Sequence, residues 1–70
     1  MNLEAAARLH MAIQAADAMG LVVTIGINHV SLSRGSHIVE RGILTKNADL
    51  GLAIGELLDR MQAWEARGKE

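Results

Sequence analysis

The sequence predicts a small α+β domain in which two helices cover an antiparallel β-hairpin, in the order helix–strand–strand–helix over residues 1–70. Alternation of β-branched with small or polar residues over 21–28, and a second apolar run over 37–44, predict the two strands. Serines and a glycine within 32–36 predict the turn between them. Apolar residues at helical spacing on both sides of this hairpin predict the helices.

The first helix is expected over residues 3–19. Asn2 can cap its N-terminus, and Glu4 lies in the first turn, where the helix dipole favours an acid. Gly20 follows the last helical residue and can adopt the left-handed conformation of a helix C-cap. The face expected to be buried carries only two branched residues among alanines: Ala5, Ala6, Leu9, Ala12, Ile13 and Ala16. Such a face buries little area but lets a partner approach closely.

The length of the turn decides which residues of the two strands lie opposite each other. A three-residue loop with Gly35 in the left-handed region pairs His29 with Val39, whereas a two-residue turn at Arg34 and Gly35 pairs His29 with Glu40. A one-residue slip moves a strand's side chains to the other face of the sheet. We favour the three-residue loop, because it places Gly35 where only glycine is comfortable.

The second helix is expected over residues 48–66, with Asn47 as its N-cap. Gly51 and Gly55 lie one turn apart beside its apolar stripe. They are either tolerated glycines or the place where the alanine face of the first helix, or of a second copy, packs closely. The stripe is the strongest helical pattern in the chain and comprises Leu50, Ile54, Leu57, Met61 and Trp64, flanked by Ala53 and Leu58.

Composition predicts one small domain that needs a partner. The chain has one Trp and neither Phe nor Tyr, so large core residues are scarce. A two-stranded hairpin is marginal in water, and both its edges are open to pairing. We therefore expect a homodimer in which two hairpins join into a four-stranded sheet. The absence of cysteine fits the cytoplasm, and no apolar run is long enough for a membrane span or resembles a signal peptide.

Residues suited to catalysis are sparse. His29, His37 and Glu40 are the candidates for general-base chemistry, and His29 faces Glu40 only in the two-residue register. These histidines, with His10, do not have the spacing of metal ligands. No serine lies in a G-x-S-x-G sequence. We expect a protein that is not an enzyme and that has no metal site and no cofactor.

Two binding functions stay open as alternatives. A dimeric β-ribbon can enter a nucleic-acid groove, with Arg34, Arg41 and Lys46 as the contacts, but a net charge of −1 and one aromatic residue give a weak footprint. The turn can instead bind a small anion or a nucleotide through its hydroxyl, N–H and guanidinium groups. The residues of that turn are Ser31, Ser33, Arg34, Gly35, Ser36 and His37.

The function that we expect first is a non-enzymatic protein-interaction module, a homodimeric adaptor or inhibitor. It would bind another protein through the hairpin tip and the outer surface of the second helix. In size and composition the chain is similar to the short accessory proteins of phages and mobile elements, although no motif carries that similarity. The residues expected to contact the partner are Ser33, Arg34, His37, Arg41 and Leu52.

Overall fold

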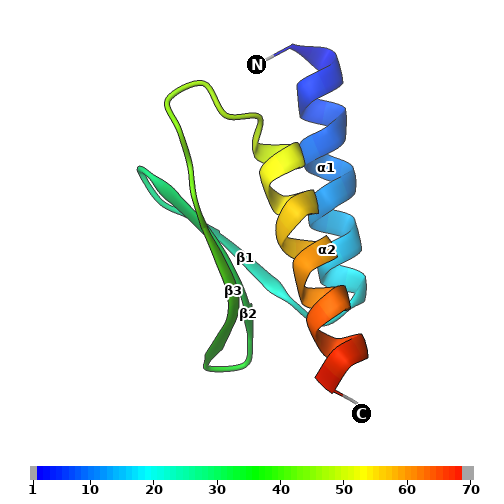
Figure 1. The fold of residues 1–70 in the computed structure, drawn as a ribbon. Coiled ribbons are helices and arrows are strands. Elements are labelled where there is room, and N and C mark those ends of the chain that lie inside the picture. The colour runs from blue at the N-terminus through cyan, green and yellow to red at the C-terminus, as the bar shows by residue number, and fades with distance from the viewer. Residues whose placement is uncertain (1, 69–70) are drawn as a thin grey trace.

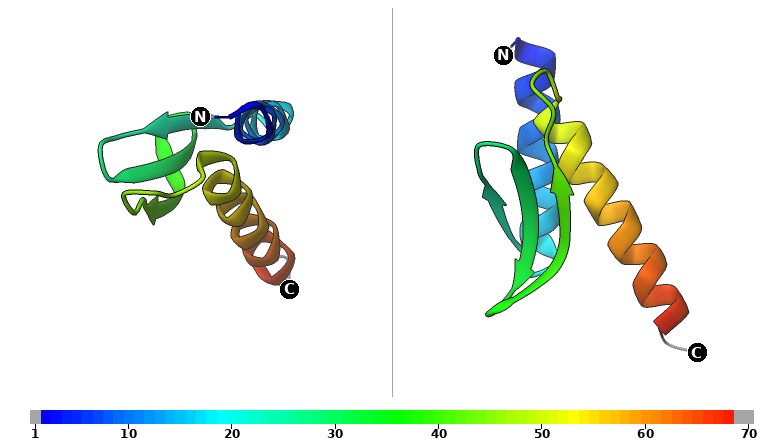
Figure 2. Two further views of the ribbon diagram at one scale, coloured as in Figure 1. Left: turned by 90° about the horizontal axis from the view of Figure 1, so that it is seen from above. Right: turned by 60° about the vertical axis from the view of Figure 1, so that its left-hand side comes forward.

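The computed structural model describes residues 2–68 and contains two helices and a three-stranded antiparallel sheet (Figure 1). Both helices lie on one face of the sheet, α1 against β1 and α2 against β2 and β3 (Figure 2). The predicted α+β class with two flanking helices is confirmed. In chain order the elements are α1 (Leu3–Ala18), β1 (Val22–Ile25), β2 (His29–Arg34), β3 (His37–Ile43) and α2 (Leu50–Gly68).

The expected two-stranded hairpin is wrong, because the first predicted strand breaks after Ile25. A tight connection over residues 26–28 returns the chain, and the Gly26 N–H donates to the His29 carbonyl at 2.8 Å. β2 then pairs with β1 on one side and with β3 on the other, in the order β1-β2-β3. A single chain thus contributes three strands. The predicted four-stranded sheet, which required two strands from each of two chains, is therefore wrong.

The register between β2 and β3 differs from both registers considered above. Arg34 lies opposite His37 across a two-residue turn at 35–36, and His29 lies opposite Ile43. Ser33 pairs with Ile38 but Leu32 pairs with Glu40, so Val39 is an extra, bulged residue. Gly35 has φ of +63°, which confirms the left-handed conformation expected for it. Gly35 is the first of two turn residues, so the favoured three-residue loop is wrong, and the turn lies one position later than the two-residue alternative at Arg34 and Gly35.

The two ends of α1 follow the predicted capping. The Asn2 side chain accepts a hydrogen bond from the Ala5 N–H at 2.8 Å. Gly20 has φ of +74° and donates to the Asp17 carbonyl, while the Leu21 N–H donates to Ala16 at 2.9 Å. This pair of bonds is a Schellman motif, and it directs Leu21 into the core.

α2 begins later than predicted, and its cap is Asp49 instead of Asn47. The Asp49 carboxylate accepts a hydrogen bond from the Leu52 N–H at 3.0 Å. The same carboxylate pairs with the Arg8 guanidinium at 2.6 Å and so ties the start of α2 to α1.

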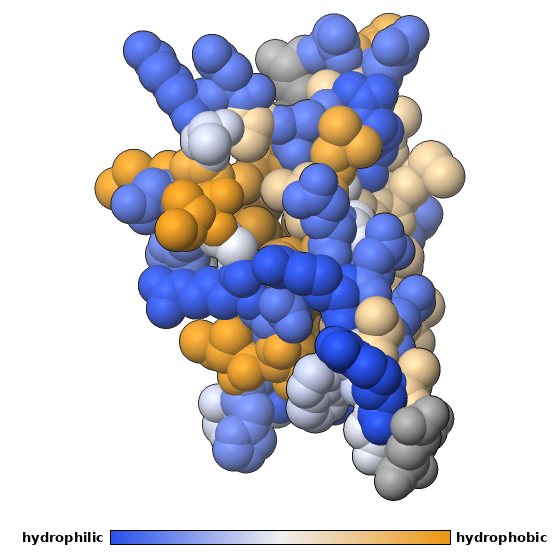
Figure 3. Space-filling model, in the orientation of Figure 1, coloured by the Kyte–Doolittle hydropathy of each residue, from blue (hydrophilic) through white to orange (hydrophobic). Residues whose placement is uncertain are grey.

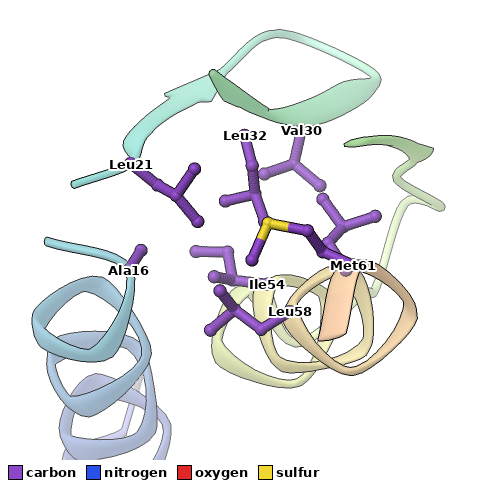
Figure 4. Packing of buried hydrophobic residues seen from close by; sticks show 8 residues of the cluster. Ala16, Leu21, Val30, Leu32, Ile54, Leu58 and Met61 are labelled. Carbon is purple, nitrogen blue, oxygen red and sulfur yellow. The ribbon is translucent and has the colours of Figure 1, made fainter. Parts of the chain in front are cut away.

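The hydrophobic core lies between the inner face of the sheet and α2 (Figure 4). Leu21 and the β2 residues Val30 and Leu32 point toward the side chains of α2, and Ala16 is the one buried residue of α1. Trp64, which we predicted within the buried stripe, is 63% exposed near the C-terminal end of α2. The buried set is Ala16, Leu21, Val30, Leu32, Ile54, Leu57, Leu58 and Met61.

The helices pack closely at one glycine. A Cβ atom added to Gly51 would lie 2.6 Å from the Arg8 carbonyl carbon, whereas one added to Gly55 would meet no atom within 4 Å. The close-packing interpretation therefore holds for Gly51 and not for Gly55. Two residues of the predicted α1 face, Ala6 and Ile13, are exposed instead of buried.

The chain exposes more surface than its mass implies. Its accessible surface is 5137 Å², against about 4,200 Å² for a typical folded monomer of this mass. An elongated shape, with extents of 41 × 21 × 20 Å, contributes to that difference. Neither α1 nor α2, over the residues described, combines the length and hydropathy that a bilayer crossing requires.

Candidate functional site

The candidate site is the face of the sheet that the helices leave uncovered, which we call the outer face. Residues directly opposite each other in neighbouring strands point to the same face, so the register defines its members. Leu32 and Val30 point into the core, and their neighbours along β2 therefore point outward. Three cross-strand rows make up the outer face: Val22–Ser33–Ile38, Thr24–Ser31–Arg41 and His29–Ile43.

Both ends of the outer face are apolar. Val22 and Ile38 are 60% and 61% exposed at one end, and Ile43 is 87% exposed at the other. Ile27, in the β1–β2 connection, extends the second end and is fully exposed. In the orientation of Figure 3, hydrophobic groups on the sheet side of the molecule lie above and below a hydrophilic band. Exposed apolar side chains gathered on one face beside polar residues are typical of an interaction surface.

The middle row of the outer face is polar and carries one cation. Ser31 is buried between Thr24 and Arg41, and the Arg41 side chain is exposed. Within residues 2–68, Arg41 forms no ion pair with a carboxylate. Arg34 and Arg60, in contrast, pair with Glu65 and Glu40 at 3.3 and 3.5 Å. Arg41 is thus a positive charge available to a partner's carboxylate.

The structure brings together only some of the predicted partner-contacting residues. Ser33 and Arg41 share the outer face, where they lie in neighbouring cross-strand rows. Arg34 and His37 lie opposite each other at the β2–β3 tip, where Glu65 of α2 already binds Arg34. Leu52 is 58% exposed on α2, on the side of the helix turned away from the sheet. These residues therefore occupy three separate surfaces.

Sequence reasoning missed the apolar residues of the outer face. Ile38 and Ile43 are five positions apart, which in a regular strand puts them on opposite faces. The bulge at Val39 rotates the strand by one position and puts both on the outer face. Nothing in the sequence marks that bulge, so the joint exposure of these two residues was not predictable from alternation.

The histidines that were considered for catalysis lie apart. His29 faces Ile43 instead of Glu40, and its ring lies over Gly26, where an added Cβ would be 2.2 Å from it. Glu40 lies on the inner face and pairs with Arg60. His10 is exposed on α1. Within the described part of the chain, no three side chains of the metal-ligating types come together.

The two alternative binding functions gain little from the geometry. Ser31 and Ser33 belong to β2 instead of the turn, and Glu65 neutralises Arg34, so no cluster of anion donors forms there. The three cations proposed to contact nucleic acid also separate: Arg34 is paired, Arg41 lies on the outer face, and Lys46 lies between β3 and α2. Their arrangement gives no continuous basic row.

The strongest electrostatic interaction supports the fold instead of a reaction. The Arg8 guanidinium and the Leu52 N–H both bind the Asp49 carboxylate and hold the pKa of Asp49 below its ordinary value. The hydrogen bond to the Asp49 carboxylate raises the pKa of Arg8. Both effects favour the charged forms of a helix cap and a helix–helix ion pair.

Concave space on the surface is shallow. A groove of about 420 Å³ runs between β3 and α2, with Gly42, Leu57 and Arg60 in its lining. Gly42 allows a close approach to α2, since an added Cβ would lie 3.2 Å from the Leu57 side chain. This groove has neither a nucleophile beside a base nor a cluster of metal ligands, so it offers contact area and no evident chemistry.

Comparisons with protein-family models, curated proteins and solved structures found no match to this chain. The outer face and the open edges of the sheet are therefore the features that indicate function.

Proposed function

We propose that the chain is a non-enzymatic protein-interaction module, an adaptor or inhibitor, that binds another protein through the outer face of its sheet. The supporting observation is the uncovered outer face, where Val22, Ile38 and Ile43 are exposed around Arg41, which pairs with no carboxylate among residues 2–68. Interface cores combine apolar residues with arginine and have few other charges. The outer face has this composition.

The chemistry of the outer face specifies the partner. Arg41 presents a planar guanidinium with several donors, which binds a carboxylate best. The apolar ends on either side of it require a partner surface that is itself apolar. The partner is accordingly a protein with an Asp or Glu set within an apolar surface.

We further propose that the module is a homodimer. The accessible surface exceeds that of a typical monomer by about 900 Å², which is close to the roughly 800 Å² that each partner buries in a standard interface. The core contains eight residues, one of which is an alanine. A second copy would cover apolar surface that the single chain leaves in water.

Capture experiments from the native host test the interaction through the outer face. The wild-type chain is compared with Arg41→Glu and with Ile38→Ser/Ile43→Ser, and Leu52→Ser is the matched control because Leu52 is an equally exposed apolar residue on α2. The captured protein is identified by mass spectrometry, and its footprint is mapped by hydrogen exchange. We expect both outer-face variants to lose it, with protection of β2 and β3 in the complex.

Two results would contradict this proposal. Undiminished capture by both outer-face variants would show that the binding surface lies elsewhere. Loss of capture in Leu52→Ser alone would move the surface to the outer side of α2. Circular dichroism on every variant checks that each one keeps the helical content of the wild-type chain.

A further inference from the structure

β1 is an open edge of the sheet with unused main-chain groups. The Gly26 N–H bonds to the His29 carbonyl, and in an antiparallel pair the residues that bond to the neighbouring strand alternate. Val22 and Thr24 therefore bond to β2, while Val23 and Ile25 direct their N–H and C=O groups away from the sheet. Within residues 2–68 no hydrogen bond reaches these four groups.

The opposite edge, at β3, is protected. The Leu44 N–H bonds to the Asn28 carbonyl, and alternation from that bond turns the main-chain groups of Arg41 toward the outside. Arg60 of α2 donates to the Arg41 carbonyl at 3.1 Å. The bulge at Val39 further disrupts the edge, as is common where proteins avoid strand addition. Ile43 also turns its main-chain groups outward, but the contact from Arg60 and the bulge interrupt the β3 edge, so strand addition is favoured at β1.

The geometry of β1 points to a second copy of this chain as its partner. If two β1 strands meet antiparallel about a two-fold axis at Thr24, Val23 of each lies opposite Ile25 of the other. All of the outward N–H and C=O groups of both residues then find partners, which makes four hydrogen bonds. No other register engages both residues of both copies, since a shift by two moves one partner into the connections flanking β1.

The side chains are also complementary to themselves in this register. On the outer face Thr24 lies opposite Thr24 of the second copy, and threonine pairs of this kind stabilise antiparallel strands. On the inner face Val23 lies opposite Ile25 of the second copy and covers it. Ile25 is 44% exposed in the single chain.

α1 supplies a second part of the interface. Figure 2 places α1 and β1 on one side of the molecule, and α2 and β3 on the other. The side of α1 that contacts α2 includes Arg8, which lies against Gly51 of α2. Ala6 and Ile13 of α1 are exposed, although their pattern is that of a buried face. A second copy joined at β1 places its own helices on the same face of the sheet, across the axis from these residues.

We propose that two copies join at β1 into a six-stranded antiparallel sheet with four helices on one face. This arrangement rests on the homodimer proposed above and gives it a defined interface. It also makes the two outer faces continuous, so that one uninterrupted surface with two Arg41 side chains faces the protein partner. The assembly is then bivalent toward that partner.

Charge at Thr24 tests the two-fold axis. Thr24 is exposed, so Thr24→Lys and Thr24→Glu change little within one copy but put like charges opposite each other in the dimer. We expect the wild-type chain to be dimeric by light scattering and sedimentation, and each variant alone to show a dimer dissociation constant raised at least tenfold. An equimolar mixture of the two variants should restore the dimer, as a mixed species in native mass spectrometry. Ile43→Lys, on β3, is the control and should remain dimeric.

Each failure has a separate meaning. A wild-type chain that is monomeric at about 100 μM would overturn both the homodimer and this arrangement, because the wild type then has no interface. A dimeric wild type whose dissociation constant neither Thr24 variant changes would overturn the arrangement alone. A monomeric wild type whose captured partner protects the Val23 and Ile25 amides from hydrogen exchange would show that an extended segment of another protein pairs with β1.

Discussion

Alanine substitutions at two glycines of α2 give opposite predictions from the same chemical change. At Gly51 the new methyl group would lie 2.6 Å from the Arg8 carbonyl carbon and 2.7 Å from the Leu9 nitrogen. Those atoms belong to the main chain of α1, so a side-chain rotation cannot relieve the contact. At Gly55, one turn later, the methyl group meets no atom within 4 Å.

The sizes of the two effects follow from competing terms. Alanine favours a helix over glycine by up to about 1 kcal/mol. At Gly51 the helices must separate by about 1 Å to reach an ordinary contact distance, and such overpacking costs about 1–3 kcal/mol. We expect Gly51→Ala to lower the free energy of unfolding by about 1–2 kcal/mol. Gly55→Ala should raise it by up to about 1 kcal/mol.

Urea denaturation followed by far-ultraviolet circular dichroism measures both variants at one protein concentration, because dimer formation makes stability depend on concentration. Thermal unfolding gives a second measurement, since each 1 kcal/mol shifts Tm by about 4–8 °C in a domain of this size. The order Gly55→Ala, wild type, Gly51→Ala, from most to least stable, is the expected result. If Gly51→Ala proves as stable as Gly55→Ala, the helices do not meet closely at Gly51, and the packing described here is incorrect.

Three further predictions concern single sites. Leu32→Ala should lower the free energy of unfolding by about 2–5 kcal/mol because Leu32 is fully buried, whereas Leu52→Ala on the exposed side of α2 should lower it by under about 1 kcal/mol. Urea denaturation of both variants measures the contrast, and equal losses of stability would show that Leu32 is not in the core. Gly35→Ala should destabilise the β2–β3 turn by about 1–2 kcal/mol because φ of Gly35 is +63°, and Gly35→Asn should have a smaller effect. Thermal unfolding measures both variants, and an unchanged stability in Gly35→Ala would argue against the left-handed turn. The lowered pKa of Asp49 means that its contribution to stability is present above about pH 4 and is lost as the pH falls through its folded-state pKa. Asp49→Asn should therefore lose less stability on acidification than the wild type. Identical profiles of stability against pH would exclude this contribution.

The helices were predictable because their signals are local. Asn2 caps α1 and Gly20 ends it as expected, since both roles depend on residues within one turn. The apolar stripe of α2 also predicted most of its buried residues. The N-cap of α2 was missed because Asn47 and Asp49 are both good caps, and a distant residue, Arg8, favours Asp49.

The sheet was only partly predictable because its pairing depends on distant residues. Ile27 continues the odd-numbered apolar row of β1 and looks like a strand residue, yet the chain reverses direction there. The signal was a change of phase: the inward positions are odd-numbered at Leu21 and Val23, whereas in β2 they are even-numbered, at Val30 and Leu32. Gly26 and Asn28 flank the change, and both residue types favour turns.

Residues that helical spacing or strand alternation assigned to a core, and that the structure leaves exposed, are candidates for contact with another chain. Ile13 of α1 and Ile25 of β1 were predicted on buried faces, and they are 40% and 44% exposed on two elements that contact each other. The second copy proposed at β1 would bury Ile25 directly, which accounts for an apolar side chain that the single chain leaves exposed.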